Sequence, residues 1–135
     1  MIKNTGVNLI KGIGVDIIQT ARFEKMTDRF ITRVYTSNER AYLHKKGHIS
    51  AAGLFAAKEA ISKALGTGFS GIWPSQIEIT HDSNGKPGVI LHNQAAQIAA
   101  NFGNYTIDLS ISHTETDAIA FAIISVNNML IGAKS

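Results

Sequence analysis

The fold is decided by residues 50–68, which read SAAGLFAAKEAISKALGTG. Ser50 is placed to begin a helix over residues 51–65, and Gly66 ends it. At about 100° per residue, Leu54, Ile61 and Leu65 share one stripe of this helix, which predicts a long helix packed against the core. A glycine-rich loop, residues 66–71, follows the helix instead of preceding it, so it is not a P-loop.

The remainder of the chain alternates short strands and short helices. Thr36 and Glu39 form a capping box, and residues 82–85 form a strong hairpin turn. The expected helices are 20–26 capped by Thr20, 36–47 closed by Gly47, and 93–102 capped by Asn93, with a short turn over 28–35. The expected strands are 13–18, 76–80, 89–91, 106–112 and 118–126. Because most strands are neighbours joined by turns, we expect an α+β fold with a largely antiparallel sheet packed on the long helix.

Length and composition indicate one domain, residues 1–135. The chain is 44% hydrophobic and 17% charged with no cysteine, which excludes a disordered tail, a disulfide scaffold and a thiolate zinc site. No apolar run reaches the roughly 18 to 20 residues that a bilayer span needs, and no secretory signal is evident. We therefore expect a cytoplasmic protein. Residues 1–11 are expected to be an N-terminal extension and residues 127–135 a loose tail.

The net charge is +3, and the basic residues are spread along the chain. Charge alone favours a solvated basic face over a dedicated binding surface. A basic module that binds acidic protein or nucleic acid without catalysis remains an alternative. Against nucleic acid, the aromatic side chains are not interleaved with the basic ones as a single-strand platform requires.

Three charged residues of the long helix are candidates for chemistry. Lys58 falls within the apolar stripe, where a free ammonium is unfavourable, and Glu59 and Lys63 have i, i+4 spacing. From spacing alone, a surface ion pair and a snorkelling lysine are the favoured interpretation. The glycines of the following loop, Gly66 and Gly68, favour a functional interpretation of these residues, because a glycine backbone can approach a phosphate closely.

Asp16 is an acid within an apolar strand, where a carboxylate is costly unless it is paired or bound to a metal. Alternation places Gly14, Asp16 and Ile18 on one face of the strand. A structural role in pairing or capping is about as plausible as a ligand role. Together with Glu59, Asp16 would provide the sparse oxygen site typical of Mg²⁺, completed by water and substrate phosphates.

His113 lies beside Ser112 at the end of a predicted strand. The two are not a catalytic pair, because adjacent strand residues point to opposite faces. His113 is suited to contact an anion or to move a proton, although a simple place in a turn is at least as plausible. The other histidines lack metal-ligand spacing, which argues against zinc.

These motifs, in this order, resemble the holo-[acyl-carrier-protein] synthase family of 4′-phosphopantetheinyl transferases. The resemblance runs from Gly12 to about Val126 and rests on the block Phe-x-x-Lys-Glu-Ala-x-x-Lys, residues 55–63, following a Gly-x-Asp strand. The chain departs from many relatives at Leu54, where they have arginine. The resemblance implies transfer of the phosphopantetheine arm of coenzyme A to a serine of apo acyl carrier protein, releasing adenosine 3′,5′-bisphosphate, in support of fatty acid biosynthesis.

The resemblance also implies roles for individual residues. It implies Asp16 and Glu59 as Mg²⁺ ligands, with Glu59, Lys63 and His113 as catalytic residues and Arg22 as a contact to the carrier protein. Coenzyme A would be bound by five residues: Lys58, Lys63, Gly66, Gly68 and His113. The family's short enzymes are homotrimers with active sites between subunits, so a homotrimer is expected, with no nucleic acid or membrane partner.

Phosphoryl transfer requires alignment and charge neutralisation more than covalent chemistry from the protein, which agrees with this assignment. The serine hydroxyl still needs a base, and Glu59 or a metal-bound water are both candidates. A carrier from polyketide or nonribosomal peptide synthesis is an alternative, although a short stand-alone chain favours the fatty-acid carrier.

Overall fold

The computed structural model describes residues 6–128 and has the α+β architecture expected from the sequence. Its elements in chain order are β1 (Val7–Gln19), η1 (Thr20–Phe23), α1 (Asp28–Val34), α2 (Ser37–His44), α3 (His48–Leu65), η2 (Pro74–Gln76), β2 (Ile77–His81), β3 (Pro87–Leu91), α4 (Asn93–Ala100), β4 (Tyr105–His113) and β5 (Asp117–Asn128). None of the helices within this described part has the length and hydropathy of a membrane-spanning helix.

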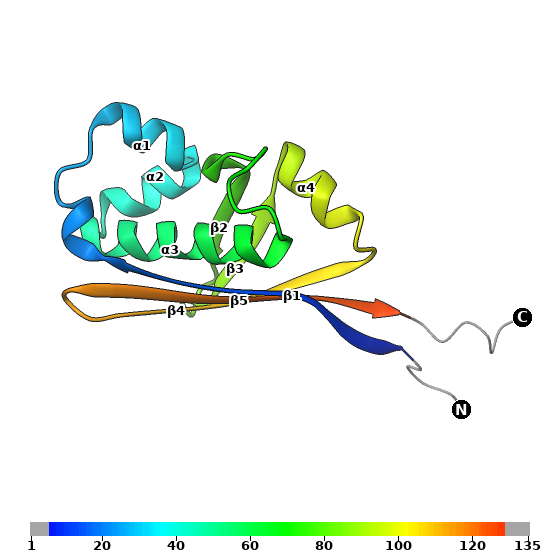
Figure 1. Ribbon diagram of the computed structural model, residues 1–135. Helices are drawn as coiled ribbons and strands as arrows, with labels where there is room; N and C mark the ends of the chain where they lie inside the picture. The colour runs from blue at the N-terminus through cyan, green and yellow to red at the C-terminus, as the bar shows by residue number, and fades with distance from the viewer. Residues whose placement is uncertain (1–5, 129–135) are drawn as a thin grey trace, which may run out of the picture.

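Two antiparallel sheets organise the fold. The larger has the strand order β1-β5-β4, and β2 and β3 form a separate hairpin. Figure 1 shows α3 lying along one face of the three-stranded sheet, with α1 and α2 stacked above one end of α3. Within residues 6–128, no helix covers the other face of the sheet (Figure 1), and this is the face whose apolar residues are exposed.

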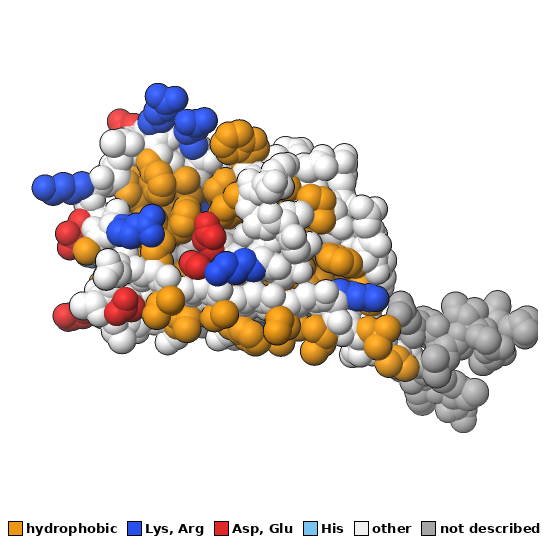
Figure 2. Space-filling view, viewed as in Figure 1, with side chains coloured by type: hydrophobic (Ala, Val, Ile, Leu, Met, Phe, Trp, Pro, Cys, Tyr) orange, Lys and Arg blue, Asp and Glu red, His pale blue; other side chains and the backbone are white. Residues whose placement is uncertain are grey.

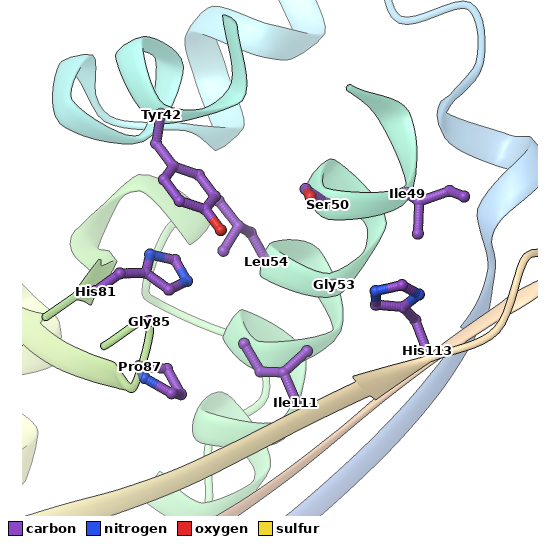
Figure 3. Close-up of a pocket in the computed structure, with 10 residues that line it drawn as sticks. All are labelled: Tyr42, Ile49, Ser50, Gly53, Leu54, His81, Gly85, Pro87, Ile111 and His113. Atoms are coloured by element: carbon purple, nitrogen blue, oxygen red, sulfur yellow. The ribbon is translucent and has the colours of Figure 1, made fainter. Parts of the chain in front are cut away.

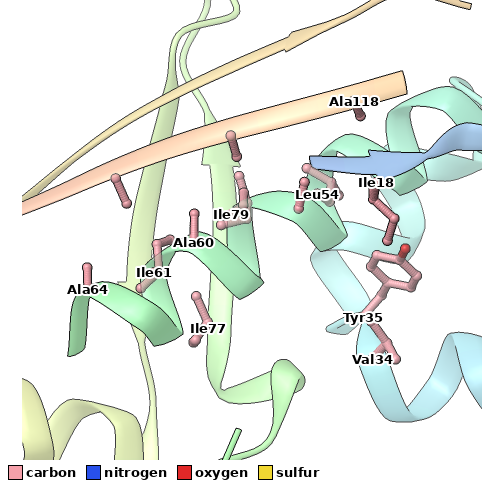
Figure 4. Packing of buried hydrophobic residues seen from close by; sticks show 14 of the residues in the cluster. Ile18, Val34, Tyr35, Leu54, Ala60, Ile61, Ala64, Ile77, Ile79 and Ala118 are labelled. Atoms are coloured by element: carbon pink, nitrogen blue, oxygen red, sulfur yellow. The ribbon is translucent and has the colours of Figure 1, made fainter. Parts of the chain in front are cut away.

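Small residues let α3 approach the sheet closely. A Cβ added at Gly14 would collide with the carbonyl oxygen of Ala60, and one at Gly12 with that of Ala64. Ala60 and Ala64 point toward the strands (Figure 4), where three buried alanines of β5 face them: Ala118, Ala120 and Ala122. The space beside Gly14 is therefore filled by the backbone of α3 and does not serve a ligand.

Several local signals are confirmed. Thr36 caps α2 and Glu39 completes the capping box. The Asp82 side chain accepts hydrogen bonds from the backbone N–H groups of Asn84 and Lys86, which closes the hairpin turn. Gly66 ends α3 in the left-handed region, with a φ of 89°. Backbone hydrogen bonding and side-chain capping thus behave as their sequence motifs predict.

Other boundaries differ from the expectation. Thr20 does not cap a helix, because its hydroxyl donates to the carbonyl of Glu115 at the turn between β4 and β5. Gly47, with a φ of 103°, stands before α3 and not at the end of α2, so α3 begins at His48 instead of after Ser50. The N-cap of α4 is His92, and Asn93 adopts a φ of 50° as its first residue.

The terminal segments are more ordered than we expected. Residues 7–11, assigned above to an extension, form the start of β1, and residues 7–10 pair with β5. Asn127 and Asn128, assigned to the tail, belong to the end of β5, where Val7 pairs with Asn128. The remainder of both predicted segments, residues 1–5 and 129–135, lies outside the described residues.

Lys58 neither reaches solvent nor offers its ammonium to a ligand, which corrects both interpretations made from the sequence. Its side chain and that of Glu39 are fully buried and form an ion pair of 2.7 Å. Lys58 Nζ also donates to the carbonyl oxygens of Pro74 and Ile77, at 3.0 and 2.6 Å. Glu39 accepts in addition from the backbone N–H of Ile79. The pair therefore joins α2, α3, η2 and β2, and it leaves Lys58 no free hydrogen for coenzyme A.

Replacing Glu39 by alanine is expected to lower the free energy of unfolding by about 3–5 kcal/mol, because it leaves the Lys58 ammonium buried without its counter-charge. Urea denaturation measures the change. Glu24→Ala, which removes an exposed carboxylate, serves as the control and should change stability by less than about 0.5 kcal/mol. Equal effects of the two substitutions would contradict the role given to the buried pair.

Candidate active site

The carboxylates of Asp16 and Glu59 form the centre of the site. Asp16 stands on β1 and Glu59 on α3, and the close approach of these two elements brings the acids together. Partial burial raises the pKa of Glu59, and repulsion from Asp16 raises it further. Asp16 thus sits close enough to disfavour the ionised form of Glu59, which is the electrostatic condition that a bound cation relieves.

Two cations flank this acidic pair. Lys63 Nζ lies 3.3 Å from Asp16 Oδ1 and donates to the carbonyl oxygen of Val15 at 3.0 Å. Lys63 and Arg22 both act to lower the pKa of Glu59, so both lie within electrostatic reach of it. Lys63 is half-exposed, and Arg22, at the last turn of η1, is exposed. Figure 2 shows acidic side chains with basic ones on either side in the middle of this face.

The glycine-rich loop caps the end of α3 with its backbone N–H groups, whereas its composition indicated an approach to phosphate. The N–H of Gly66 donates to the carbonyl of Lys63, and the N–H groups of Thr67 and Gly68 donate to that of Ser62. These bonds cap the C-terminus of α3, where the helix dipole is negative. Any contact of Gly66 or Gly68 with a phosphate would therefore be made through the bare Cα and not through a backbone donor.

His113 lies in a separate pocket. This cavity of about 250 Å³ is formed by α2, α3, the β2–β3 hairpin and β4. Figure 3 shows His113 and Ile111 entering it from β4, with Tyr42 and His81 across from them. The rings of Tyr42 and His81 are stacked, with centroids 4.1 Å apart and planes within 5°. Burial and the nearby Lys46 lower the pKa of His81, which favours the neutral form of its ring.

The helix α3 separates the two groups of residues. Ser50, Gly53 and Leu54 line the His113 pocket, and at about 100° per residue they lie roughly opposite Glu59 and Lys63 around the helix axis. In the sheet, Asp16 is on edge strand β1 and His113 on edge strand β4, with β5 between them. Within one chain the structure thus brings Asp16, Glu59, Lys63 and Arg22 together, and places His113 apart from them.

Two features were not predicted from the sequence: the stacked rings in the His113 pocket and the exposed apolar side of β1. Tyr42 and His81 come from different elements, so no local pattern links them. The exposed apolar side of β1 was detectable, because Ile13, Val15 and Ile17 alternate with residues that face α3. A strand that is apolar on both faces is typical of burial on both faces.

The donor set of the acidic pair fits Mg²⁺. Asp16 and Glu59 offer only hard carboxylate oxygens, and within residues 6–128 no group of three or more histidine, aspartate, glutamate or cysteine residues gathers that could form an all-protein metal cage. Mg²⁺ is commonly bound by one or two carboxylates, with water and substrate phosphates completing its shell. The two acids beside Lys63 meet that description without a further protein ligand.

Comparison with known proteins shows the family to which the chain belongs. Residues 12–122 match the 4′-phosphopantetheinyl transferase superfamily. The holo-[acyl-carrier-protein] synthase of Clostridium acetobutylicum is 46% identical over 123 residues, which cover 87% of this chain and 99% of that protein.

Solved structures give the same result. A holo-(acyl-carrier-protein) synthase from Bacillus anthracis, in complex with coenzyme A (3′,5′-ADP), is 40% identical with a TM-score of 0.73, covering 86% of this chain and 96% of its own. The acyl carrier protein synthase of Plasmodium yoelii with ADP bound is 34% identical with a TM-score of 0.82, covering 91% and 100%. The expected fold and the expected class of enzyme, a phosphopantetheinyl transferase, are thereby confirmed, and the chain belongs to the 4′-phosphopantetheinyl transferase superfamily.

Proposed function

We propose that this protein is a Mg²⁺-dependent holo-[acyl-carrier-protein] synthase that transfers the phosphopantetheine arm of coenzyme A to a serine of an apo acyl carrier protein. The observation that carries the proposal is the juxtaposition of Asp16, Glu59 and Lys63 where β1 meets α3. Two carboxylates beside a half-exposed lysine suit a pyrophosphate that must be aligned and neutralised. Membership of the superfamily supports the same reaction.

In this reaction the serine oxygen bonds to the phosphorus next to the pantetheine arm, and the bond to the oxygen of the departing adenosine 3′,5′-bisphosphate breaks. Lys63 is placed to hold the pyrophosphate and to stabilise the negative charge on the leaving phosphate. Glu59 stands at the same centre as Asp16 and Lys63, and this position supports its carboxylate as the group that takes the serine proton.

Asp16 and Glu59 are the proposed Mg²⁺ ligands. A divalent cation bound there would supply charge neutralisation at the pyrophosphate. Without it, the phosphates would face two carboxylates, and Lys63 alone would not offset that repulsion. Burial and, after it, repulsion from Asp16 raise the pKa of Glu59, and this repulsion between the two acids supports the assignment.

The His113 pocket is the proposed site for the nucleotide end of coenzyme A. The stacked rings of Tyr42 and His81 give one wall of the pocket a flat polar–aromatic surface, and His113 offers a group suited to contact a phosphate. Lys46 adds positive charge beside this pocket, because its Nζ lies 5.6 Å from the centroid of the Tyr42 ring. Because His113 and Glu59 lie on opposite sides of α3, a pocket of one subunit would serve the acidic pair of another.

We further propose that the protein is a homotrimer, assembled through the uncovered face of the three-stranded sheet. Five large apolar side chains there are 40% to 65% exposed: Ile13, Val15, Ile17, Ile119 and Phe121. The register places Val15 beside Phe121 and Ile17 beside Ile119, so they form one continuous patch. Figure 2 shows this apolar row along the lower edge of the molecule. Contiguous exposed apolar surface of this kind is typical of an interface.

The proposed carrier is the acyl carrier protein of fatty acid biosynthesis, and the proposed location is the cytoplasm. Arg22 is exposed beside Glu59 and would meet an acidic carrier close to the reacting phosphates. The net charge of +3 supports electrostatic attraction of such a partner. Recovery of the native protein in an exported fraction would contradict the cytoplasmic assignment.

Arm transfer is tested by the intact mass of an apo acyl carrier protein after incubation with this protein, coenzyme A and Mg²⁺. We expect a mass gain of one phosphopantetheine arm that EDTA abolishes. Asp16→Ala and Glu59→Ala should each reduce the rate by about 100-fold or more, because each removes a ligand of the cation. Glu115→Ala, which removes an exposed carboxylate elsewhere, is the control.

Full activity of both Asp16→Ala and Glu59→Ala would refute the metal assignment, and no transfer to any of several apo carriers would favour a binding module without catalysis.

The assembly is tested by sedimentation at micromolar concentration. We expect a mass of about three chains for the wild type and a large shift to single chains for Phe121→Asp, because a buried unpaired carboxylate at the interface is costly. Ile90→Asp changes an equally exposed residue on β3 and should leave the assembly intact. A wild-type protein that sediments as a single chain would contradict the trimer.

A further inference from the structure

The wall of the His113 pocket contains no permanently charged side chain among the described residues. The cavity of about 250 Å³ is lined by ten residues (Figure 3): Tyr42, Ile49, Ser50, Gly53, Leu54, His81, Gly85, Pro87, Ile111 and His113. Of these, only His81 and His113 can become cations, and burial together with the nearby Lys46 lowers the pKa of His81. The wall therefore offers hydroxyl and imidazole groups to a ligand, without the fixed positive charge of a lysine or an arginine.

Two lysines close to this pocket lie outside its wall. Lys46 and Lys86 are both exposed, and neither lines the cavity. Lys46 Nζ lies 5.6 Å from the centroid of the Tyr42 ring, and Lys86 stands in the turn between β2 and β3. Exposed lysines contribute little to an ionic contact, because water solvates the ammonium and the long side chain loses entropy when it is held in place.

Leu54 is the residue of this wall at which a cation is missing. It belongs to α3, lines the cavity and is 2% exposed. It is also the position at which the chain departs from many relatives, which have arginine there. Leu54 gives the pocket an apolar surface where a guanidinium would give it a fixed charge and several hydrogen-bond donors.

The missing charge concerns one group of coenzyme A, the 3′-phosphate of its ribose. The pyrophosphate is assigned above to Asp16, Glu59 and Lys63, so the 3′-phosphate is the phosphate that a pocket for the nucleotide end has to accommodate. A phosphate carries between one and two negative charges at neutral pH, and moving it out of water is costly unless opposite charge meets it. In a pocket without a fixed cation, this phosphate stays in water at the mouth and adds little to binding.

We infer that the pocket does not require the 3′-phosphate, and that the protein accepts 3′-dephospho-coenzyme A as a second donor of the phosphopantetheine arm. The inference rests on the proposed function. The bonds that change are the same: the serine oxygen bonds to the phosphorus next to the pantetheine arm, its proton passes to the base, and the bond from that phosphorus to the oxygen of the departing nucleotide breaks. The modified carrier is identical, and adenosine 5′-monophosphate leaves in place of adenosine 3′,5′-bisphosphate.

Initial rates of carrier modification, followed by intact mass at varied donor concentration, test the inference. The value of kcat/KM for 3′-dephospho-coenzyme A should lie within about fivefold of that for coenzyme A, because a phosphate exposed to water contributes no more than that. Adenosine 5′-monophosphate and adenosine 3′,5′-bisphosphate, used as inhibitors that compete with coenzyme A, should have inhibition constants within about fivefold of each other.

Leu54→Arg supplies the missing cation and gives a second readout. It should raise the preference for coenzyme A over 3′-dephospho-coenzyme A by about tenfold or more, as a charge-assisted hydrogen bond to a phosphate does. Leu54→Met, which stays neutral and has a similar volume, should leave the ratio of the two kcat/KM values unchanged.

A wild-type preference for coenzyme A above about fivefold, or an unchanged preference in an active Leu54→Arg enzyme, would overturn the inference and leave the proposed function intact. The wild-type comparison decides the question even where Leu54→Arg fails to fold. Absence of transfer from both donors would overturn the inference and the proposed function together.

Discussion

The buried ion pair between Lys58 and Glu39 is the contact on which the rest of the molecule depends. It uses every hydrogen of the Lys58 ammonium within the protein and joins α2, α3, η2 and β2 at one point. Burial lowers the pKa of Lys58, and the facing carboxylate of Glu39, with a smaller contribution from Glu78, opposes that shift. Because Lys58 is held toward the hairpin, the rotation of α3 is set, and the next residue, Glu59, is directed to the side of β1.

The close approach of β1 to α3 completes that geometry. Gly12 and Gly14 face backbone carbonyls of α3 that any larger residue would displace. This contact brings Asp16 to within 3.3 Å of Lys63 and into electrostatic reach of Glu59. The acidic pair is thus a product of helix rotation and strand approach together, and both are determined by residues that do not touch a substrate.

Much of this arrangement could be predicted from the sequence, because its signals are local. The long helix, its end at Gly66, the capping box at Thr36 and the turn at Asp82 all depend on residues within a few positions of one another. The chemistry of the residues offered Asp16 and Glu59 as a shared oxygen site, the family resemblance implied the same pair, and the structure brings the two acids together. The burial of Lys58 in an ion pair could not be predicted, since its partner Glu39 is 19 residues away and its two carbonyl acceptors belong to other elements. The start of β1 was missed for a similar reason, because its pairing with β5 spans nearly the whole chain.

The central claim is that one reaction centre combines the acidic pair of one subunit with the His113 pocket of another. It is tested most directly by mixing. Asp16→Ala protein and His113→Ala protein should each be nearly inactive alone. When the two are unfolded and refolded together in equal amounts, transfer should recover to about a quarter of the wild-type rate. This is the statistical share of interfaces in a cyclic assembly that have both halves intact. No recovery in the mixture, or wild-type activity of His113→Ala alone, would contradict the claim.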